Sequence, residues 1–220
     1  MSTISASTTT TTAYQVSADT TGALVIQTGA TPTTALTIDT GQRSKFPTTI
    51  GVGGATPSTS GSGITFPATQ SASSDANTLD DYEEGTWTPS VVATTTNPTV
   101  TYTKQAGVYT KIGNLVTVNF QIVLSAISGG SGYAQIGGFP FTAAPSSSTL
   151  PSYSSGCFSE TGINFTWPSG FTQIAMELTN STTSAYITFL ASAKDQAVVS
   201  IANMASGNNY FVGTLSYRTT

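Results

Sequence analysis

The segment Leu115-Val-Thr-Val-Asn-Phe-Gln-Ile-Val-Leu124 carries the clearest structural pattern in this chain. Apolar side chains occupy every second position from Val116 onward, and polar residues such as Thr117 and Asn119 stand between them. Successive side chains of a β-strand point to opposite faces, so this alternation predicts a strand with one buried face. We therefore expect the surrounding domain to be built from β-sheet.

Similar segments follow along the C-terminal part of the chain. They cover residues 171–178, 185–190 and 210–217, with weaker examples near 99–103, 108–112, 133–136 and 198–202. Glycine- and serine-rich turns separate them, and no segment keeps a helical period beyond two turns. Many short strands joined by polar turns are typical of an antiparallel β-sandwich of the jelly-roll kind. We expect such a sandwich over residues 90–220, in an all-β protein.

Residues 1–74 have a different composition, rich in serine and threonine. Residues 1–12 end in five consecutive threonines and have too little apolar surface to fold alone. Between Tyr14 and Pro67, apolar runs of three to five residues alternate with turn residues. Strands this short cannot bury a core within one chain. We expect an extended arm whose strands intertwine with those of other chains.

The charge inventory narrows the classes of partner. Charged residues make up 7% of the chain, against roughly a quarter in typical proteins, and the net charge is −4. Six scattered basic residues cannot form the patch that nucleic acid requires, so we expect no nucleic-acid partner. No apolar run approaches the roughly 20 residues of a membrane span, and the N-terminus lacks a secretory signal. A nearly chargeless hydroxyl surface favours packing against identical copies or a larger assembly.

Catalytic chemistry has few carriers in this sequence. Histidine is absent, which removes the commonest general base and the commonest zinc ligand. The single cysteine, Cys157, cannot form an internal disulfide or a thiolate metal site. We therefore expect a non-enzymatic protein without a cofactor.

The strongest metal-like feature is an acidic run. Half of the ten acidic residues fall within ten positions, namely Asp75, Asp80, Asp81, Glu83 and Glu84. Carboxylate oxygens are the ligands that Ca²⁺ prefers, but the spacing does not match an EF-hand loop. In a loop that begins at Asp75, the sixth position is Asp80, where an EF-hand has glycine. We interpret residues 75–89 as a solvated, weakly helical linker, with these five residues as a weaker calcium alternative.

Aromatic residues offer a second candidate site. Trp167, Tyr153 and Tyr210 present flat apolar rings of the kind that stack on sugars. Aromatic residues in a β domain more often belong to the core or to cross-strand pairs. Glycan contact through these three residues is therefore the less favoured interpretation.

Two neighbouring segments of the chain resemble those of a known protein family. The stretches Gly63-Ile-Thr-Phe-Pro-Ala-Thr-Gln70 and Asp75-Ala-Asn-Thr-Leu-Asp-Asp-Tyr-Glu-Glu-Gly-Thr-Trp-Thr-Pro89 are similar to a segment of tailed-bacteriophage virion proteins, described as tail fibre, head fibre or decoration proteins. Residues 107–118 and 136–141 resemble the β domain of the same family, and residues 35–41 and 50–53 its stalk repeats. The resemblance implies a homotrimer at the virion surface, synthesised in the host cytoplasm. It also implies that the arm binds other tail or capsid proteins, with Tyr14, Val16, Leu24 and Ile26 as anchoring candidates.

Two functions remain open on the sequence alone. The first is a virion structural protein, namely a short fibre, spike or decoration anchored through its N-terminal arm. The alternative is an adhesin whose C-terminal domain binds a host surface polysaccharide. A polysaccharide depolymerase ranks third: glycoside hydrolysis needs two facing carboxylates, and among Glu160, Glu177 and Asp195 no pattern places a partner opposite Glu177.

Overall fold

A computed structural model describes residues 22–28, 31, 33–70, 72–75, 77–147, 153–160, 166–192, 194–204, 207 and 209–219. The chain divides into two units, Met1–Ser71 and Ala72–Thr220. The expectation of an all-β protein is confirmed, since strands and one short 3₁₀ helix make up the regular structure of these residues. No helix in the described ranges has the length and apolar character needed to cross a membrane.

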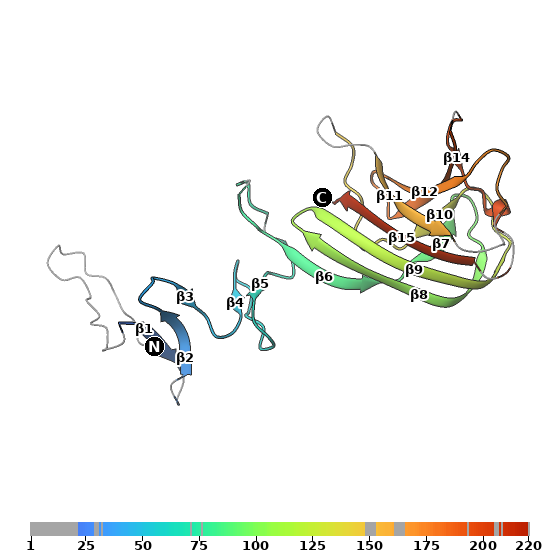
Figure 1. Cartoon of the computed structure of the whole chain (residues 1–220). Helices are drawn as coiled ribbons and strands as arrows, with labels where there is room; N and C mark the ends of the chain where they lie inside the picture. Colours follow the sequence, from blue (N-terminus) through green and yellow to red (C-terminus); the bar gives the residue numbers. More distant parts are fainter. Residues whose placement is uncertain are drawn as a thin grey trace. The chain divides into compact units, whose positions relative to one another are not determined.

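The N-terminal unit consists of very short strands. β1 (Leu24–Thr28), β2 (Thr33–Ile38) and β3 (Ser44–Lys45) form an antiparallel sheet, and β4 (Ile50–Gly51) pairs in parallel with β5 (Ile64–Thr65) (Figure 1). None of the side chains described between residues 22 and 70 is buried. The unit therefore has no apolar core of its own in these residues.

The C-terminal unit is one large antiparallel sheet with the order β6-β8-β9-β15-β11-β12-β13-β10-β7, and β14 adds to β13 (Figure 1). Its elements are β6 (Tyr82–Trp87), β7 (Ser90–Ala93), β8 (Thr99–Ile112), β9 (Leu115–Ser128), β10 (Ala134–Gly137), β11 (Tyr153–Glu160), β12 (Gln173–Thr179), β13 (Ser184–Leu190), β14 (Ala197–Val198), the 3₁₀ helix η1 (Ile201–Asn203) and β15 (Asn209–Arg218).

The longest strands, β8 and β9, form a hairpin. Gly113 and Asn114 are the turn between the paired residues Ile112 and Leu115, and Gly113 has a φ of 55°. A two-residue hairpin turn needs such positive φ values, which glycine adopts without steric cost. Alternate residues of β9 from Val116 to Leu124 are buried, which confirms the strand and the buried face expected from its alternation.

The sandwich of two sheets expected for residues 90–220 is corrected to a single curled sheet. β6 and β7 are its two edge strands, yet only Thr88 and Pro89 separate them in the sequence. A link of this length spans only about 10 Å, so the two edges of the sheet must come together. Curling of the sheet meets this constraint and encloses the apolar residues on its inner face.

The same finding corrects the interpretation of residues 75–89 as a linker. Residues 82–87 form β6, which pairs with β8 along its whole length. The backbone of β6 satisfies its hydrogen bonds within the sheet, so the second half of this segment belongs to the domain. The carbonyl of Asp75 accepts a hydrogen bond from the Thr78 amide, which makes a turn rather than a helix at the start of the segment.

Glycine and aromatic residues face each other across three strand pairs on the inner face. Trp87 pairs with Gly107, Tyr109 with Gly85, and Phe120 with Gly213. A Cβ atom placed on Gly107 would lie 2.5 Å from Nε1 of Trp87, so the indole ring occupies the space that a side chain would need. These glycines let large rings lie close to the sheet, where Trp87 stacks on Phe139 with centroids 5.1 Å apart.

Gly107→Ala is expected to destabilise the C-terminal unit by about 1–3 kcal/mol, because the added methyl group overpacks the site beneath Trp87. Urea denaturation followed by tryptophan fluorescence measures this loss. The neighbouring substitution Ala106→Val, on an exposed position of the same strand, should change the free energy of unfolding by less than about 0.5 kcal/mol. Equal stabilities for the two variants would contradict the close packing of Trp87 on Gly107.

Candidate functional site

The acidic run is divided between the two faces of the sheet. Along β6, Glu83 and Trp87 point to the inner face, and Asp81, which directly precedes the strand, is buried with them. Tyr82 and Glu84 point to the outer face and are exposed. The period of two along the strand therefore separates carboxylates that are neighbours in the sequence.

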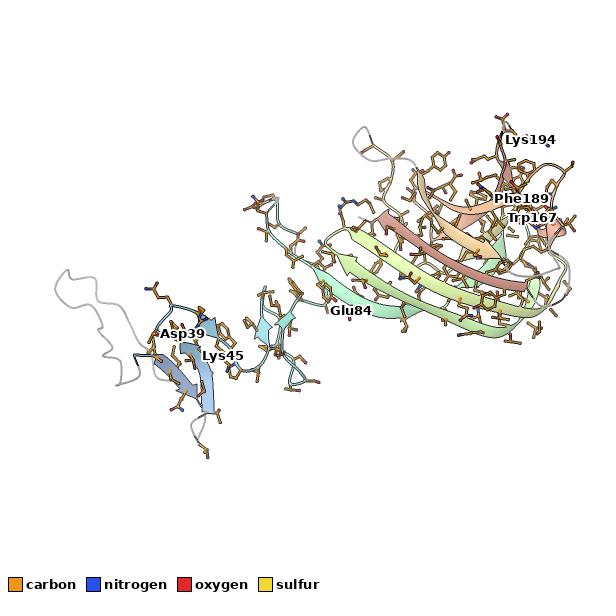
Figure 2. All side chains as sticks on the ribbon, in the orientation of Figure 1. Asp39, Lys45, Glu84, Trp167, Phe189 and Lys194 are labelled. Carbon is orange, nitrogen blue, oxygen red and sulfur yellow. The ribbon has the colours of Figure 1, made fainter. Side chains whose placement is uncertain are left out.

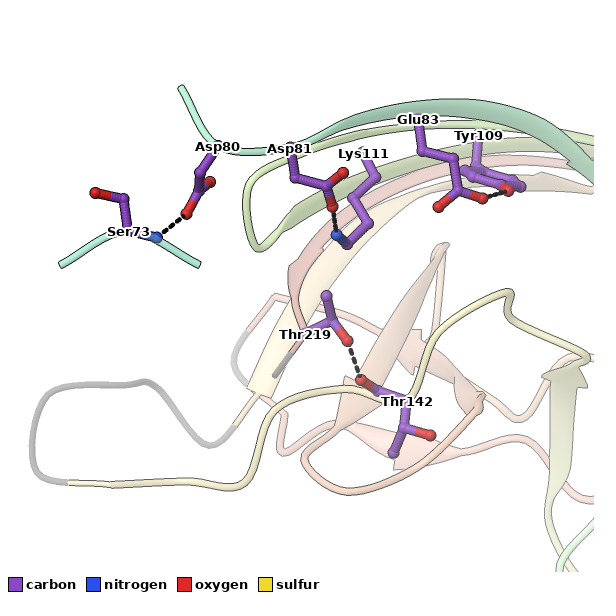
Figure 3. Close-up of polar contacts among 8 residues, drawn as sticks. All are labelled: Ser73, Asp80, Asp81, Glu83, Tyr109, Lys111, Thr142 and Thr219. Atoms are coloured by element: carbon purple, nitrogen blue, oxygen red, sulfur yellow. Dashed lines mark hydrogen bonds and ion pairs between the residues drawn. The ribbon is translucent and has the colours of Figure 1, made fainter. Parts of the chain in front are cut away.

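Asp81 forms a buried ion pair with Lys111 of β8 (Figure 3). Nζ of Lys111 donates to Oδ2 of Asp81, and both side chains are only 6% exposed. Lys111 Nζ also lies 5.6 Å from the centroid of the Phe141 ring, which gives the ammonium group a second favourable contact. Removing each charge from water costs several kcal/mol, and only the attraction to its buried partner offsets this cost. The pair therefore holds β6 in position on β8, provided that both partners are present.

Each glutamate of β6 binds a tyrosine. The Tyr109 hydroxyl donates to Oε1 of Glu83 (Figure 3), and this hydrogen bond raises the pKa of Tyr109 to about 12. On the outer face the Tyr82 hydroxyl donates to Oε1 of Glu84, and this bond likewise raises the pKa of Tyr82. Both carboxylates thereby act as hydrogen-bond acceptors within the protein.

The two remaining acidic residues bind local backbone groups. Oδ2 of Asp80 accepts a hydrogen bond from the Ser73 amide at 2.8 Å (Figure 3), and Oδ1 of Asp75 accepts one from the Asn77 amide at 2.9 Å. Among the residues that the structure describes, no three Asp, Glu, Cys or His side chains are placed to share a metal ion. The five candidate calcium ligands therefore do not converge on one site.

Phe141 and Thr142 follow β10 in the chain, and Phe141 lies beside Lys111 and Tyr109 on the inner face of the sheet. The Tyr217 hydroxyl donates to the carbonyl of Phe141 at 2.9 Å, and Oγ1 of Thr219 donates to the carbonyl of Thr142 at 2.9 Å (Figure 3). Burial raises the pKa of Tyr217 to about 12. The Phe141 ring packs edge-on against Tyr109, with centroids 5.3 Å apart. Phe141 thus contacts both Tyr109 and Lys111 on the inner face.

The three glycan candidates lie apart from one another. Tyr153 begins β11, whereas Tyr210 precedes Phe211, which pairs with the last residue of that strand. The seven-residue separation along β11 corresponds to about 23 Å. Tyr210 accepts a hydrogen bond from Gln121, and Tyr153 is the most exposed large aromatic residue of the described chain.

Trp167 belongs to a third location. Its ring lies 5.1 Å from that of Phe189, a buried residue of β13, and Figure 2 places these two side chains together. Lys194 lies nearby, with Nζ 5.4 Å from the centroid of the Phe171 ring. Trp167 thus packs at the margin of the core, against a strand that carries neither Tyr153 nor Tyr210.

The anchoring candidates are only partly covered by the structure. Tyr14 and Val16 lie outside the described residues. Leu24 and Ile26 stand two positions apart on β1 and therefore on one face, and Ile26 is exposed.

Lys111 and Tyr109 are the structurally important residues that the sequence interpretation did not identify. A signal for them exists in the hairpin, because a Gly-Asn turn fixes the register of β8 on β9. This register pairs Lys111 with buried Val116, so it places the lysine on the inner face. The acidic partner is thirty residues away in the sequence and has no comparable local signal.

Comparison with known proteins gives one similar solved structure. No family model matches the chain, and no curated protein matches it. Among solved structures, the crystal structure of Dettilon tailspike protein (gp208) has 17% identity and a TM-score of 0.48. The alignment covers 77% of this chain and 31% of that chain, so this protein spans about a third of the tailspike.

Lys111→Met should destabilise the C-terminal unit by about 3–5 kcal/mol, because it leaves the Asp81 carboxylate buried without a partner. The double variant Asp81→Leu/Lys111→Met should recover most of this loss, because no buried charge remains. Denaturant unfolding monitored by circular dichroism measures both, with exposed Lys104→Met on the same strand as the matched control. A double variant no more stable than Lys111→Met would contradict the buried pair.

Tyr109 and Tyr217 should ionise near pH 12, about two units above the ordinary tyrosine pKa. Between pH 10 and 12 the unfolded chain releases protons that the folded chain retains, so stability falls as the pH rises through this range. Absorbance at 295 nm follows the titration, and Tyr109→Phe should remove part of the change near pH 12. The same chain unfolded in guanidinium should lack this late component. An unchanged late component in Tyr109→Phe would contradict the hydrogen bond to Glu83.

Proposed function

We propose that this chain is a structural protein of a tailed-bacteriophage virion, acting as a homotrimeric short fibre, spike or decoration. In this proposal the N-terminal unit attaches the protein to tail or capsid proteins, and the C-terminal unit is an outward, non-enzymatic domain. The phage assignment rests on the resemblance of Gly63–Gln70 and Asp75–Pro89 to virion proteins. The number three is implied by that resemblance alone.

The exposed apolar surface of the N-terminal unit is the observation that supports self-association. Five of its large apolar side chains are 37–55% exposed, namely Val25, Ile26, Phe46, Val52 and Ile64. Each Å² of apolar surface removed from water contributes roughly 25 cal/mol, and this unit buries none of its described side chains completely. Coverage by other chains supplies the missing apolar contacts, as expected for a multi-chain stalk.

The charge distribution of the first 74 residues is compatible with close contact between copies. Two acidic residues, Asp19 and Asp39, and two basic residues, Arg43 and Lys45, give this segment a net charge of zero. Asp39 and Arg43 form an ion pair within the chain at 2.8 Å, and Figure 2 labels Asp39 and Lys45 on this unit. Identical chains therefore meet little electrostatic repulsion when their N-terminal units associate.

The geometry of the C-terminal unit favours the structural role over the adhesin. Its buried carboxylate, Asp81, is engaged with Lys111, and Glu83 accepts the Tyr109 hydroxyl. The aromatic residues considered for sugar stacking occupy separate locations. No observation in the described residues selects a glycan site.

The full chain should sediment at three times its monomer mass, and Ile26→Asp/Ile64→Asp should shift it toward the monomer, because both charges would enter the apolar contact. Analytical ultracentrifugation measures the mass, and circular dichroism checks that the C-terminal unit stays folded. Thr48→Asp, an exposed polar position in the same unit, is the control. A monomeric wild-type chain at micromolar concentration would remove the physical basis of the proposal. Mass spectrometry of purified particles that encode this chain tests its presence in the virion.

A further inference from the structure

One end of the sheet's outer face carries a continuous row of exposed apolar side chains. Tyr82 pairs with Ile112, and Ile112 pairs with Leu115 across the hairpin turn. Directly paired residues share a face, so these three side chains lie next to one another on β6, β8 and β9. They are 38–49% exposed, which is unusual for three adjacent large residues of a sheet whose other face is the core. This set is called the outer row below.

The outer row ends in opposite charges. On β15, Arg218 pairs with Leu115 and extends the row by one strand. At the other end, Glu84 follows Tyr82 on the same face of β6 and accepts its hydroxyl hydrogen bond. Four strands spaced by roughly 4.8 Å place Arg218 about 14 Å from the β6 end of the row. The acid and the base of one chain therefore cannot reach each other directly.

A hollow adjoins the outer row on the same face. It has a volume of about 440 Å³, and its outward lining residues are Glu84, Thr86, Val108, Thr110, Thr117 and Asn119. Glu84 is the only charged residue among all those that line it. An apolar side chain from a neighbouring molecule that enters this hollow removes no charged group other than Glu84 from water.

We infer that the outer row is the contact surface between C-terminal units of neighbouring copies of this chain. The inference rests on the self-association proposed above and adds the surface that joins the globular units. In a closed ring, each copy presents one end of its row to the opposite end of the next. Arg218 of one copy then lies beside Glu84 of the next copy, and Ile112 and Leu115 face the ring axis. Because one end of the row is basic and the other is acidic, the ends that meet in such a head-to-tail contact carry opposite charges.

Mixed oligomers test this contact directly. Chains carrying Glu84→Cys and chains carrying Arg218→Cys are co-expressed, both with Cys157→Ser to remove the exposed native thiol. A short bis-maleimide should join the two kinds of chain into a covalent dimer, because the two positions meet only between copies. Each variant expressed alone should give no dimer, since identical positions in neighbouring copies are separated by the length of one row.

Charge reversal in the otherwise natural full chain gives an independent readout. Glu84→Arg and Arg218→Glu should each raise the concentration at which oligomers dissociate by about tenfold, because they place like charges together. The double variant Glu84→Arg/Arg218→Glu should return to within about threefold of the natural chain, since opposite charges meet again. Tyr133→Lys, an exposed aromatic position preceding β10, is the control and should leave dissociation unchanged.

The outcomes separate this inference from the proposed function. An oligomeric natural chain with no mixed cross-link and no response to charge reversal would overturn the outer-row contact alone. A monomeric natural chain would overturn both. A mixed cross-link together with recovery in the double reversal supports the outer-row contact.

Discussion

The sheet of the C-terminal unit depends on one constraint, namely that a single short segment supplies both of its edge strands. β6 pairs with β8, and β7 pairs with β10 at the far end of the strand order, although two residues separate them. The ten strands must therefore curl until their two edges meet. This curling encloses the apolar face without a second sheet. Cross-strand glycines make the curvature compatible with large rings, as at Gly107 beneath Trp87, because the ring needs the volume of the missing side chain.

The polar contacts of β6 serve this closure. A buried pair such as Asp81 and Lys111 contributes little net stability relative to an apolar pair, but an incorrect register would leave each charge without its partner. The pair thus penalises displacement of β6 along β8. The Tyr217 hydroxyl and Thr219 tie the chain after β10 over the same end of the inner face. The acidic segment is consequently a structural element of the domain on its inner side.

The outer side of the same strand has a different character. Alternation sends Tyr82 and Glu84 outward, beside exposed Ile112 and Leu115, while Asp81 and Glu83 are directed inward. One short sequence therefore contributes both to the closure of the fold and to the surface on which copies of the chain are proposed to meet. The same division explains why the candidate site was only half predictable. Composition identified the carboxylates, and the hairpin turn places their partners on β8 on the inner face, but no local pattern links two groups that are 26 and 30 residues apart in the sequence.

The sequence by itself determined the local features of this protein. The alternation in 115–124 determines a strand and its buried face, the Gly113-Asn114 turn determines the hairpin register, and the short apolar runs before residue 70 determine strands too small for a core. Only the tertiary structure decided that the sheet is single and curled, that residues 82–87 belong to it, and that Asp81 meets Lys111. An alternating pattern specifies which side chains share a face, but it fits a sandwich and a curled sheet equally well. The choice between them depends on pairings between distant strands, whose free energy comes from contacts that exist only when the whole sheet has formed.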